Sequence, residues 1–366
     1  MKNKHLFRLI LTFSISFLAA AQSAIFAQTT TDFSKNIVQK LNTWANLPDE
    51  KVYLNFDKAY YSVGEKIWFN GFLADAITHL PDTISQTLYV EISYLETNKI
   101  IEKQTLQIVN SRVWGGFFTE KWAAGTYLIR AYTNWMRNAP DDFYFQKKIE
   151  LLATAETPPQ YLAEKKAKFD VQFFPEGGNL VVNLPCNVAF KALDVSTGKG
   201  VKVMGKIVND SGDSLAKIQD DFSGIGRFSL KPVLGKKYLA QLTFPDGSQQ
   251  NFDLPTAQNE GMALTLDNSR PEQPIRAFVY LNSLSEKMPT AFFALAHVRG
   301  QSVFATKIDV TNKDLKTFRF NIPRENLASV EGVVCLTVFD DKGMPLCERL
   351  FFHENPNTTR AFFSGE

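Results

Sequence analysis

The feature that most constrains this chain is a hydrophobic pattern that repeats every second residue from Pro48 onward. Short segments, such as KIWFNGFL and TLYVEISYL, are separated by Gly, Asn, Asp and Pro. Alternation puts successive side chains on opposite faces of a strand, and regularly spaced turns are typical of antiparallel sandwiches. With 31 Phe, 13% aromatic and 21% charged residues in 366, a folded chain is favoured over a disordered one. We therefore predict an all-β protein of tandem antiparallel sandwiches.

The chain is long enough for two or three domains, and its composition changes at two places. A polar, Pro-containing bridge over 155–168 predicts a linker between a first sandwich at 49–154 and a second at 169–258. A softer break near LPTAQNEG predicts a third sandwich at 259–355, followed by a tail at 356–366.

An internal repeat supports three related domains. Each block ends in a short strand, a turn and a longer strand, and an earlier strand also corresponds between blocks. The corresponding positions are Ile67–Gly71, Val188–Ala192 and Ala277–Tyr280 in the earlier strand, Phe118, Phe228 and Phe320 in the short strand, and Gly125, Gly235 and Gly332 before the longer strand.

Residues 1–27 are typical of an export signal, with Lys2, Lys4 and Arg8 before an apolar run. Its removal takes three of 40 basic residues and none of 38 acidic ones, which leaves a net charge of about −1. A basic surface for nucleic acid is therefore not supported. No later stretch approaches the roughly 20 apolar residues of a membrane helix, so we expect no transmembrane segment in the mature chain.

Residues 28–48 are predicted to form a short helix and linker. Ile37, Leu41 and Trp44 are spaced as on one face of a helix. The expected location is the periplasm, or an outer-membrane-associated or cell-surface position.

The stretch EKVYLNFDKAYYSVGEKIWFNGFL resembles the first strands of the MG2-type domain of the α2-macroglobulin superfamily. The matching positions are Val52, Tyr53, Leu54, Asp57, Lys58, Tyr61, Gly64, Glu65, Ile67 and Phe69. FDVQFFPEGGNLVVNLPCNVAFKALD and GVVCLTVFDDKGMPLCERLFF resemble the next two domains of large exported proteins of Bacteroidota.

The resemblance implies an all-β fold of tandem immunoglobulin-like or macroglobulin-like antiparallel sandwiches, and it also indicates what is missing. The protease traps of the superfamily carry a Cys-Gly-Glu-Gln thioester, and this motif does not occur here. The Bacteroidota relatives often continue into further sandwiches or a plug domain like that of TonB-dependent receptors. The chain ends at Gly365–Glu366 without either, which implies a short or a truncated member.

Asp57 and Lys58 are either a catalytic pair or structural residues. Adjacent strand residues point to opposite faces, so we favour an Asp57 that satisfies turn amides and a solvated Lys58. Gly64 and Glu65 are expected to form the turn before a strand that runs through residues 66–73.

Within that strand, alternation divides the side chains between two faces. Ile67 and Phe69 belong to the predicted core face, and Trp68 and Phe72 to the opposite face. We predict that Trp68 and Phe72 form a contact surface.

Other chemistry is weakly supported. Gly177–Gly178 lacks the spacing of a phosphate loop and reads as a β-turn. His79, His297 and His353 show no HExxH spacing, and the acidic doublets lack the pattern of a calcium loop. There is no GxSxG, and Cys186 is more typical of a buried apolar residue than of a nucleophile. We expect no catalytic, cofactor-binding or metal-binding residues.

Cys335 and Cys347 flank a predicted hairpin turn at 340–343 at similar distances. Export permits oxidation, so a cross-strand disulfide is one of two outcomes, and hairpin register decides between them.

The five tryptophans leave two alternatives open, sugar-stacking platforms or ordinary core, and we favour core. They are Trp44, Trp68, Trp114, Trp122 and Trp135.

These observations predict a non-enzymatic exported cell-envelope binding or scaffold protein with a protein partner, associated with outer-membrane TonB-dependent receptor-type systems. The alternatives are a non-covalent protease-binding protein, suggested by the superfamily alone, and a carbohydrate-binding module.

Overall fold

The computed structural model describes residues 36–43, 49–153, 169–195, 197–282, 291–310 and 316–355. The predicted signal peptide, the 155–168 linker, the 356–366 tail and Trp44 lie outside these ranges. Among the described residues, no helix is both long and apolar enough to span a bilayer.

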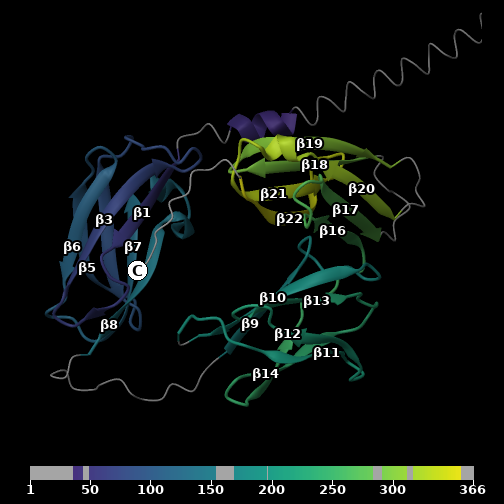
Figure 1. Ribbon diagram of the computed structural model, residues 1–366, viewed down its shortest axis with the longest axis horizontal. Helices are drawn as coiled ribbons and strands as arrows, with labels where there is room; N and C mark the ends of the chain where they lie inside the picture. The colour runs from purple at the N-terminus through teal and green to yellow at the C-terminus, as the bar shows by residue number, and fades with distance from the viewer. Residues whose placement is uncertain are drawn as a thin grey trace, which may run out of the picture. The chain divides into compact units, whose positions relative to one another are not determined.

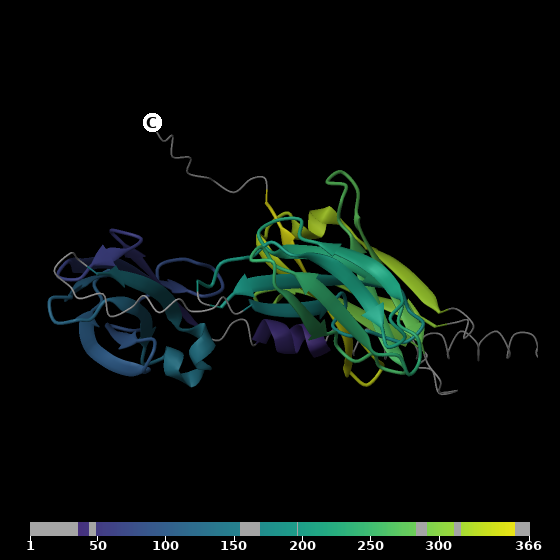
Figure 2. The same ribbon diagram turned by 90° about the horizontal axis from the view of Figure 1, so that it is seen from below.

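The described chain is almost entirely antiparallel β-structure, and its strands form three two-layered sandwiches (Figures 1 and 2). The predicted fold class is confirmed. Residues 45–165 form one compact unit that holds the first sandwich, and the remaining residues form a second unit that holds the other two.

The first sandwich pairs a three-stranded sheet, ordered β1-β3-β6, with a five-stranded sheet, ordered β2-β8-β7-β4-β5. All neighbours are antiparallel except β2 and β8. The strands are β1 (Glu50–Phe56), β2 (Tyr61–Ser62), β3 (Lys66–Asp75), β4 (Thr87–Tyr94), β5 (Lys99–Gln107), β6 (Arg112–Phe118), β7 (Gly125–Thr133) and β8 (Phe145–Leu152), with 3-10 turns η1 (Met136–Asn138) and η2 (Asp141–Phe143).

The second sandwich packs sheet β13-β10-β9 on sheet β12-β11-β14-β15. Its strands are β9 (Phe169–Pro175), β10 (Cys186–Asp194), β11 (Met204–Asn209), β12 (Ser214–Gln219), β13 (Ile225–Leu230), β14 (Tyr238–Thr243) and β15 (Gln249–Asp253).

The third sandwich packs sheet β16-β17-β20 on sheet β19-β18-β21-β22. Its elements are β16 (Gly261–Asp267), β17 (Ile275–Asn282), β18 (Ala291–Val298), β19 (Gln301–Asp309), β20 (Thr317–Ile322), η3 (Arg324–Leu327), β21 (Gly332–Phe339) and β22 (Pro345–His353).

Apart from the additional β2 of the first, the three sandwiches share one strand order, which supports the internal repeat. Each has a three-stranded sheet whose central strand is β3, β10 or β17, and these strands hold the residues that the sequence aligned. The equivalence of Phe118 with Phe228 is wrong by one position. Phe118 is exposed, whereas Phe117 fills the core as Phe228 does.

Alternation explains why these segments form strands. In β3 the burial pattern places Ile67 and Phe69 inside and Trp68 and Phe72 outside, as predicted. The inward residues of each sandwich form a separate hydrophobic cluster, within 52–151, 169–254 and 262–347. Burial of these apolar faces supplies most of the driving force for folding.

A helix over residues 36–43 covers the outer side of the third sandwich, beside β18 and β19 in Figure 1. Ile37 and Val38 line a narrow crevice together with Phe293 and Leu295 of β18. Because the helix covers the outer face of β18, side chains on both faces of this strand are buried.

A turn after β9 joins the second and third sandwiches. The Glu176 carboxylate accepts hydrogen bonds from Arg349 Nε at 3.1 Å and from the Leu266 amide at 3.2 Å. Gly177 has a φ of +92°, and a Cβ there would lie 2.6 Å from the Leu264 nitrogen. The predicted turn at Gly177–Gly178 is therefore also one of the contacts between the two domains, beside the packing of Val181 and Leu184 on Ala263.

Candidate functional site

A hydrogen-bond network around Asp57 holds the start of β3. Tyr61 Oη donates to Asp57 Oδ1 at 2.6 Å, and the Trp68 amide donates to the same oxygen at 3.1 Å. Burial, together with this hydrogen bond, raises the pKa of the fully buried Tyr61. Asp57 thus ties the loop after β1 to the first residues of β3.

Lys58 and Glu65 form a second link across the same loop. Lys58 Nζ lies 2.7 Å from Glu65 Oε1, and the Ser62 amide donates to Glu65 Oε2 at 2.9 Å. These hydrogen bonds lower the pKa of Glu65, and the bond to Glu65 raises the pKa of Lys58. Gly64, at a φ of +90°, makes the turn between the two partners. The Asp57 and Lys58 side chains therefore bond to different residues and do not meet at a common position for a ligand.

The outer side of sheet β1-β3-β6 carries a group of solvent-exposed aromatic side chains, which we call the aromatic face. Its members come from all three strands of the first sandwich. They are Tyr53 on β1, Trp68 and Phe72 on β3, and Trp114 and Phe118 on β6, and they are 59%, 52%, 41%, 61% and 59% exposed.

Strand register brings the five rings onto one surface. Tyr53 pairs with Phe72 across β1 and β3, and their side chains therefore lie side by side. Trp114 pairs with Asn70, which is the next outward residue of β3 before Phe72, so the Trp114 ring lies on the same face as Phe72. The two edge strands thus extend the contact surface that was predicted from β3 alone.

Gly116 makes room for the indole of Trp68. It lies directly opposite Trp68, and a Cβ at this position would lie 3.1 Å from Trp68 Cε3 and 2.7 Å from the Ile67 carbonyl oxygen. Lys66 Nζ lies 3.3 Å from the Trp68 ring centroid and 4.2 Å from that of Phe118. A cation therefore already occupies a ring face on which a sugar would stack.

The charges on the aromatic face have one sign. Lys51, Lys66 and Arg112 occupy outward positions, and Arg112 lies 6.0 Å from the Phe72 ring centroid. None of the described outward side chains of β1, β3 and β6 is a carboxylate. The face is apolar and aromatic with a basic border.

The expectation that the tryptophans are core residues is wrong for Trp68 and Trp114, and Trp135 is also exposed. Trp122 does pack on the core, stacked on Tyr127 at 5.2 Å. Tyr53, Trp114 and Phe118 were missed as surface residues. The alternation in EKVYLNF and RVWGGFF could have revealed Tyr53 and Trp114, since both strands bury every second residue at these positions.

A buried ion cluster on the other sheet of this sandwich was also missed. Glu91 accepts hydrogen bonds from Lys103 at 2.8 Å, Arg130 at 3.0 Å and Tyr132 at 2.6 Å. Burial opposes ionisation, but the three hydrogen bonds outweigh it and lower the pKa of Glu91 to about 2. A carboxylate with this pKa stays ionised at neutral pH and is poorly suited to general acid-base catalysis.

Of the two outcomes left open for Cys335 and Cys347, the structure has the unbridged one, with both thiols free. Cys347 pairs with Val338 and Cys335 pairs with Leu350, so the two cysteines are three positions out of register. Cys347 faces the core, whereas Cys335 lies on the other side of β21, next to Thr337. The turn spans residues 340–344, and a bulge follows it where the register shifts between Val338 and Phe339. Together they move the hairpin away from the symmetric register that the spacing suggested.

The remaining candidates are structural. Cys186 is buried, and burial raises the pKa of its thiol to about 11, which disfavours the reactive thiolate. Within the described ranges, no three His, Cys, Asp or Glu side chains are grouped so that they could hold a metal ion.

Comparison with known proteins gives distant structural neighbours only. No family model and no curated protein matches the sequence. The native conformation of Escherichia coli alpha-2-macroglobulin is 11% identical over 84% of this chain and 22% of its own, with a TM-score of 0.24. Salmonella alpha-2-macroglobulin reacted with methylamine is 11% identical over 83% of this chain and 23% of its own, with a TM-score of 0.24. The Escherichia coli adhesin FdeC is 12% identical over 82% of this chain and 96% of its own, with a TM-score of 0.21.

The chain spans less than a quarter of the length of these macroglobulins, and the similarity does not assign it to a family. The fold and the site define a class: an all-β protein of tandem sandwiches with an exposed aromatic sheet face.

Proposed function

We propose that this chain is a non-enzymatic, exported binding protein of the cell envelope, and that the aromatic face docks a protein partner. The observation that carries this proposal is the exposure of five aromatic rings on one sheet of the first sandwich. Monomeric proteins seldom leave contiguous aromatic surface in water unless it binds something. Trp, Tyr, Phe and Arg are also the residue types enriched at the energetic centres of protein interfaces.

The charges on the face indicate the chemistry of the partner. With Lys51, Lys66 and Arg112 at its border, the face suits a protein surface that presents apolar side chains surrounded by carboxylates. The family resemblance noted in the sequence makes an outer-membrane receptor of the TonB-dependent type a natural candidate for this partner.

A sugar platform is less well supported at this position. Stacking on a pyranose needs a free ring face, and Lys66 lies over the Trp68 ring. No observation in the structure favours protease binding over other protein binding.

The test is a pull-down from native envelopes with three forms of the tagged mature chain. The first is wild type, the second carries Trp68→Ala and Trp114→Ala, and the third carries Phe222→Ala and Phe352→Ala. Phe222 and Phe352 are equally exposed rings on the other two sandwiches, so the third form is a matched control.

We expect one envelope protein to be retained by wild type and by the control and to be lost with the double tryptophan variant. Raised salt should weaken its retention, because basic residues border the face. Equal retention by all three forms would contradict the proposal. Recovery of a protease that the chain inhibits would favour the inhibitor alternative instead.

A further inference from the structure

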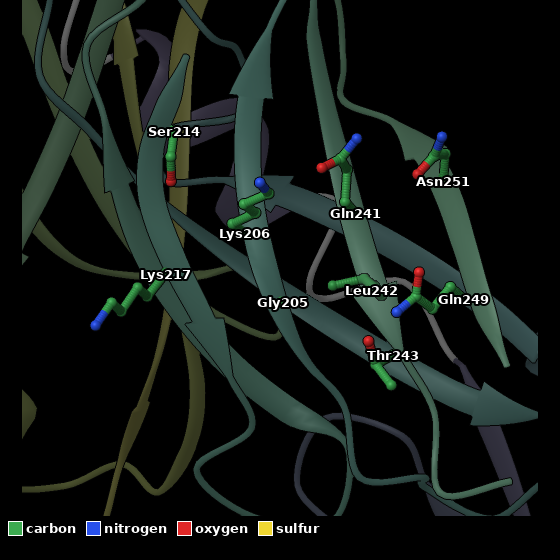
Figure 3. Close-up of a pocket in the computed structure, with 9 residues that line it drawn as sticks. All are labelled: Gly205, Lys206, Ser214, Lys217, Gln241, Leu242, Thr243, Gln249 and Asn251. Atoms are coloured by element: carbon green, nitrogen blue, oxygen red, sulfur yellow. The ribbon is translucent and has the colours of Figure 1, made fainter. Parts of the chain in front are cut away.

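The outer side of sheet β12-β11-β14-β15 in the second sandwich holds an open hollow with a volume of about 830 Å³ (Figure 3). This volume is in the range of small-ligand sites. The hollow belongs to a different domain from the aromatic face, and the two do not depend on one another.

Register aligns four polar side chains in one row across the hollow. Lys217 on β12 pairs with Lys206 on β11, Lys206 pairs with Gln241 on β14, and Gln241 pairs with Asn251 on β15. Thr243 and Gln249 form a neighbouring pair on β14 and β15. Figure 3 shows these side chains rising from adjacent strands of one sheet.

The two lysines are direct neighbours across β11 and β12, and no carboxylate among the described residues compensates their charges. Like charges directly opposite on neighbouring strands destabilise a sheet, and paired residues there have Cβ atoms only about 5 Å apart. The residues that line the hollow include no carboxylate. Within the described ranges, neither Lys206 nor Lys217 forms an ion pair, whereas Lys58, Lys103 and Lys236 each meet a carboxylate within 2.8 Å. A bound anion would supply the missing charge.

The amide side chains indicate a second property of the ligand, which is that it carries hydroxyl groups. Gln241, Gln249 and Asn251 make no side-chain hydrogen bond to other described residues and are open to solvent. Each amide presents both donors and an acceptor, which suits hydroxyl groups that also donate and accept. The lining residues include no aromatic ring, so the base stacking that single-stranded nucleic acid requires is not provided.

From these observations we infer that the hollow binds an acidic oligosaccharide. The two ammonium groups would pair with its carboxylates, and the amides and Thr243 would bind its hydroxyls. The row across four strands would let a linear sugar chain lie over the sheet.

The test is calorimetric titration of the full mature chain with a uronic-acid tetrasaccharide. A neutral tetrasaccharide and tripolyphosphate serve as comparison ligands. The site variant carries Lys206→Gln and Lys217→Gln. The control variant carries Lys191→Gln and Lys231→Gln, which removes the same charge from exposed positions outside the hollow.

We expect the uronic-acid chain to bind wild type and the control with equal affinity. The site variant should bind about tenfold more weakly or worse, because a charge-assisted hydrogen bond is lost at each lysine. Asn251→Ala should weaken binding of the uronic-acid chain but not that of tripolyphosphate, since only the sugar offers hydroxyls.

Four results would overturn the inference. They are no binding of the uronic-acid chain, equal binding of the neutral sugar, an equal loss of affinity in the control variant, and tighter binding of tripolyphosphate with no effect of Asn251→Ala. The circular dichroism spectrum and melting temperature of each variant establish that it is folded. The spectra should be unchanged, and the melting temperature of the site variant should equal or slightly exceed that of wild type, because the substitutions remove a like-charge pair.

Discussion

The buried hydroxyl of Tyr61 donates a hydrogen bond of 2.6 Å to the carboxylate of Asp57, four residues earlier in the chain. The same carboxylate oxygen accepts the Trp68 amide at the start of β3. One acidic side chain thus fastens the loop after β1 to the strand that carries Trp68 and Phe72. Asp57 and Tyr61 therefore position the strand that carries the aromatic face, and they are not themselves part of that face.

Replacement of Asp57 by Ala should therefore lower stability without abolishing binding. It leaves the Tyr61 hydroxyl and the Trp68 amide without their acceptor, at a cost of about 2 kcal/mol. Tyr61→Phe removes only the hydroxyl and should cost less, about 1 kcal/mol. Calorimetric melting and the envelope pull-down measure the two properties. Unchanged melting with lost partner binding would show that Asp57 contacts the ligand.

The Glu91 cluster predicts a pH dependence of stability. The pKa of Glu91 in the folded chain is about 2, below its ordinary value of 4.5, so folding favours the ionised form. Its contribution is fully present above about pH 5 and is lost as the pH falls toward 2. The sandwich should lose about 3 kcal/mol of stability from this group over that window.

Glu91→Gln isolates this contribution from other acid effects. Urea unfolding at pH 7, 4 and 2.5 should show a gap between wild type and variant that is widest at pH 7 and narrows in acid. A gap that stays constant across the three pH values would mean that Glu91 is not the titrating group.

The local hydrophobic pattern predicted the strands and their faces, because alternation within a single strand assigns each side chain to the buried or the exposed face. KIWFNGFL alternates strictly, and Ile67 and Trp68 lie on the faces that alternation assigned. Pairing between strands could not be predicted in the same way. The register that places Tyr53 beside Phe72, and Cys347 opposite Val338, depends on turn geometry and bulges that no single segment encodes.

Neither the hollow nor the ion cluster could be predicted from the sequence, and the reason is the same. Lys206 and Lys217 are ordinary surface residues until pairing sets them opposite one another. Glu91, Lys103 and Arg130 come from three strands, and only the sheet order β7-β4-β5 brings them together.

The cysteines provide a direct test of register. We expect three free thiols per mature chain in denaturant without reductant, because Cys335 and Cys347 lie on opposite sides of the hairpin. Under native conditions all three should react slowly, because burial raises the pKa of Cys186 and Cys335 to about 11 and that of Cys347 to about 12. Cys335 should react first, since it is the least buried. A count of one free thiol in denaturant would establish the disulfide and refute the register.

Substitution of the two adjacent glycines after β9 distinguishes the cost of backbone strain from the cost of a lost domain contact. Gly177 and Gly178 both have positive φ, at +92° and +100°, but only Gly177 is packed, with Leu264 of β16 against its Cα. Gly178→Ala should cost about 1 to 2 kcal/mol for the left-handed backbone alone. Gly177→Ala adds a clash of its Cβ with the Leu264 nitrogen at 2.6 Å and should be the more destabilising of the two, about 3 kcal/mol or more. It should also weaken the coupling between the second and third sandwiches and bring their unfolding closer to two separate calorimetric transitions, because the turn is one of their contacts, beside the packing of Val181 and Leu184 on Ala263. Equal losses for the two variants would mean that the turn does not join the domains.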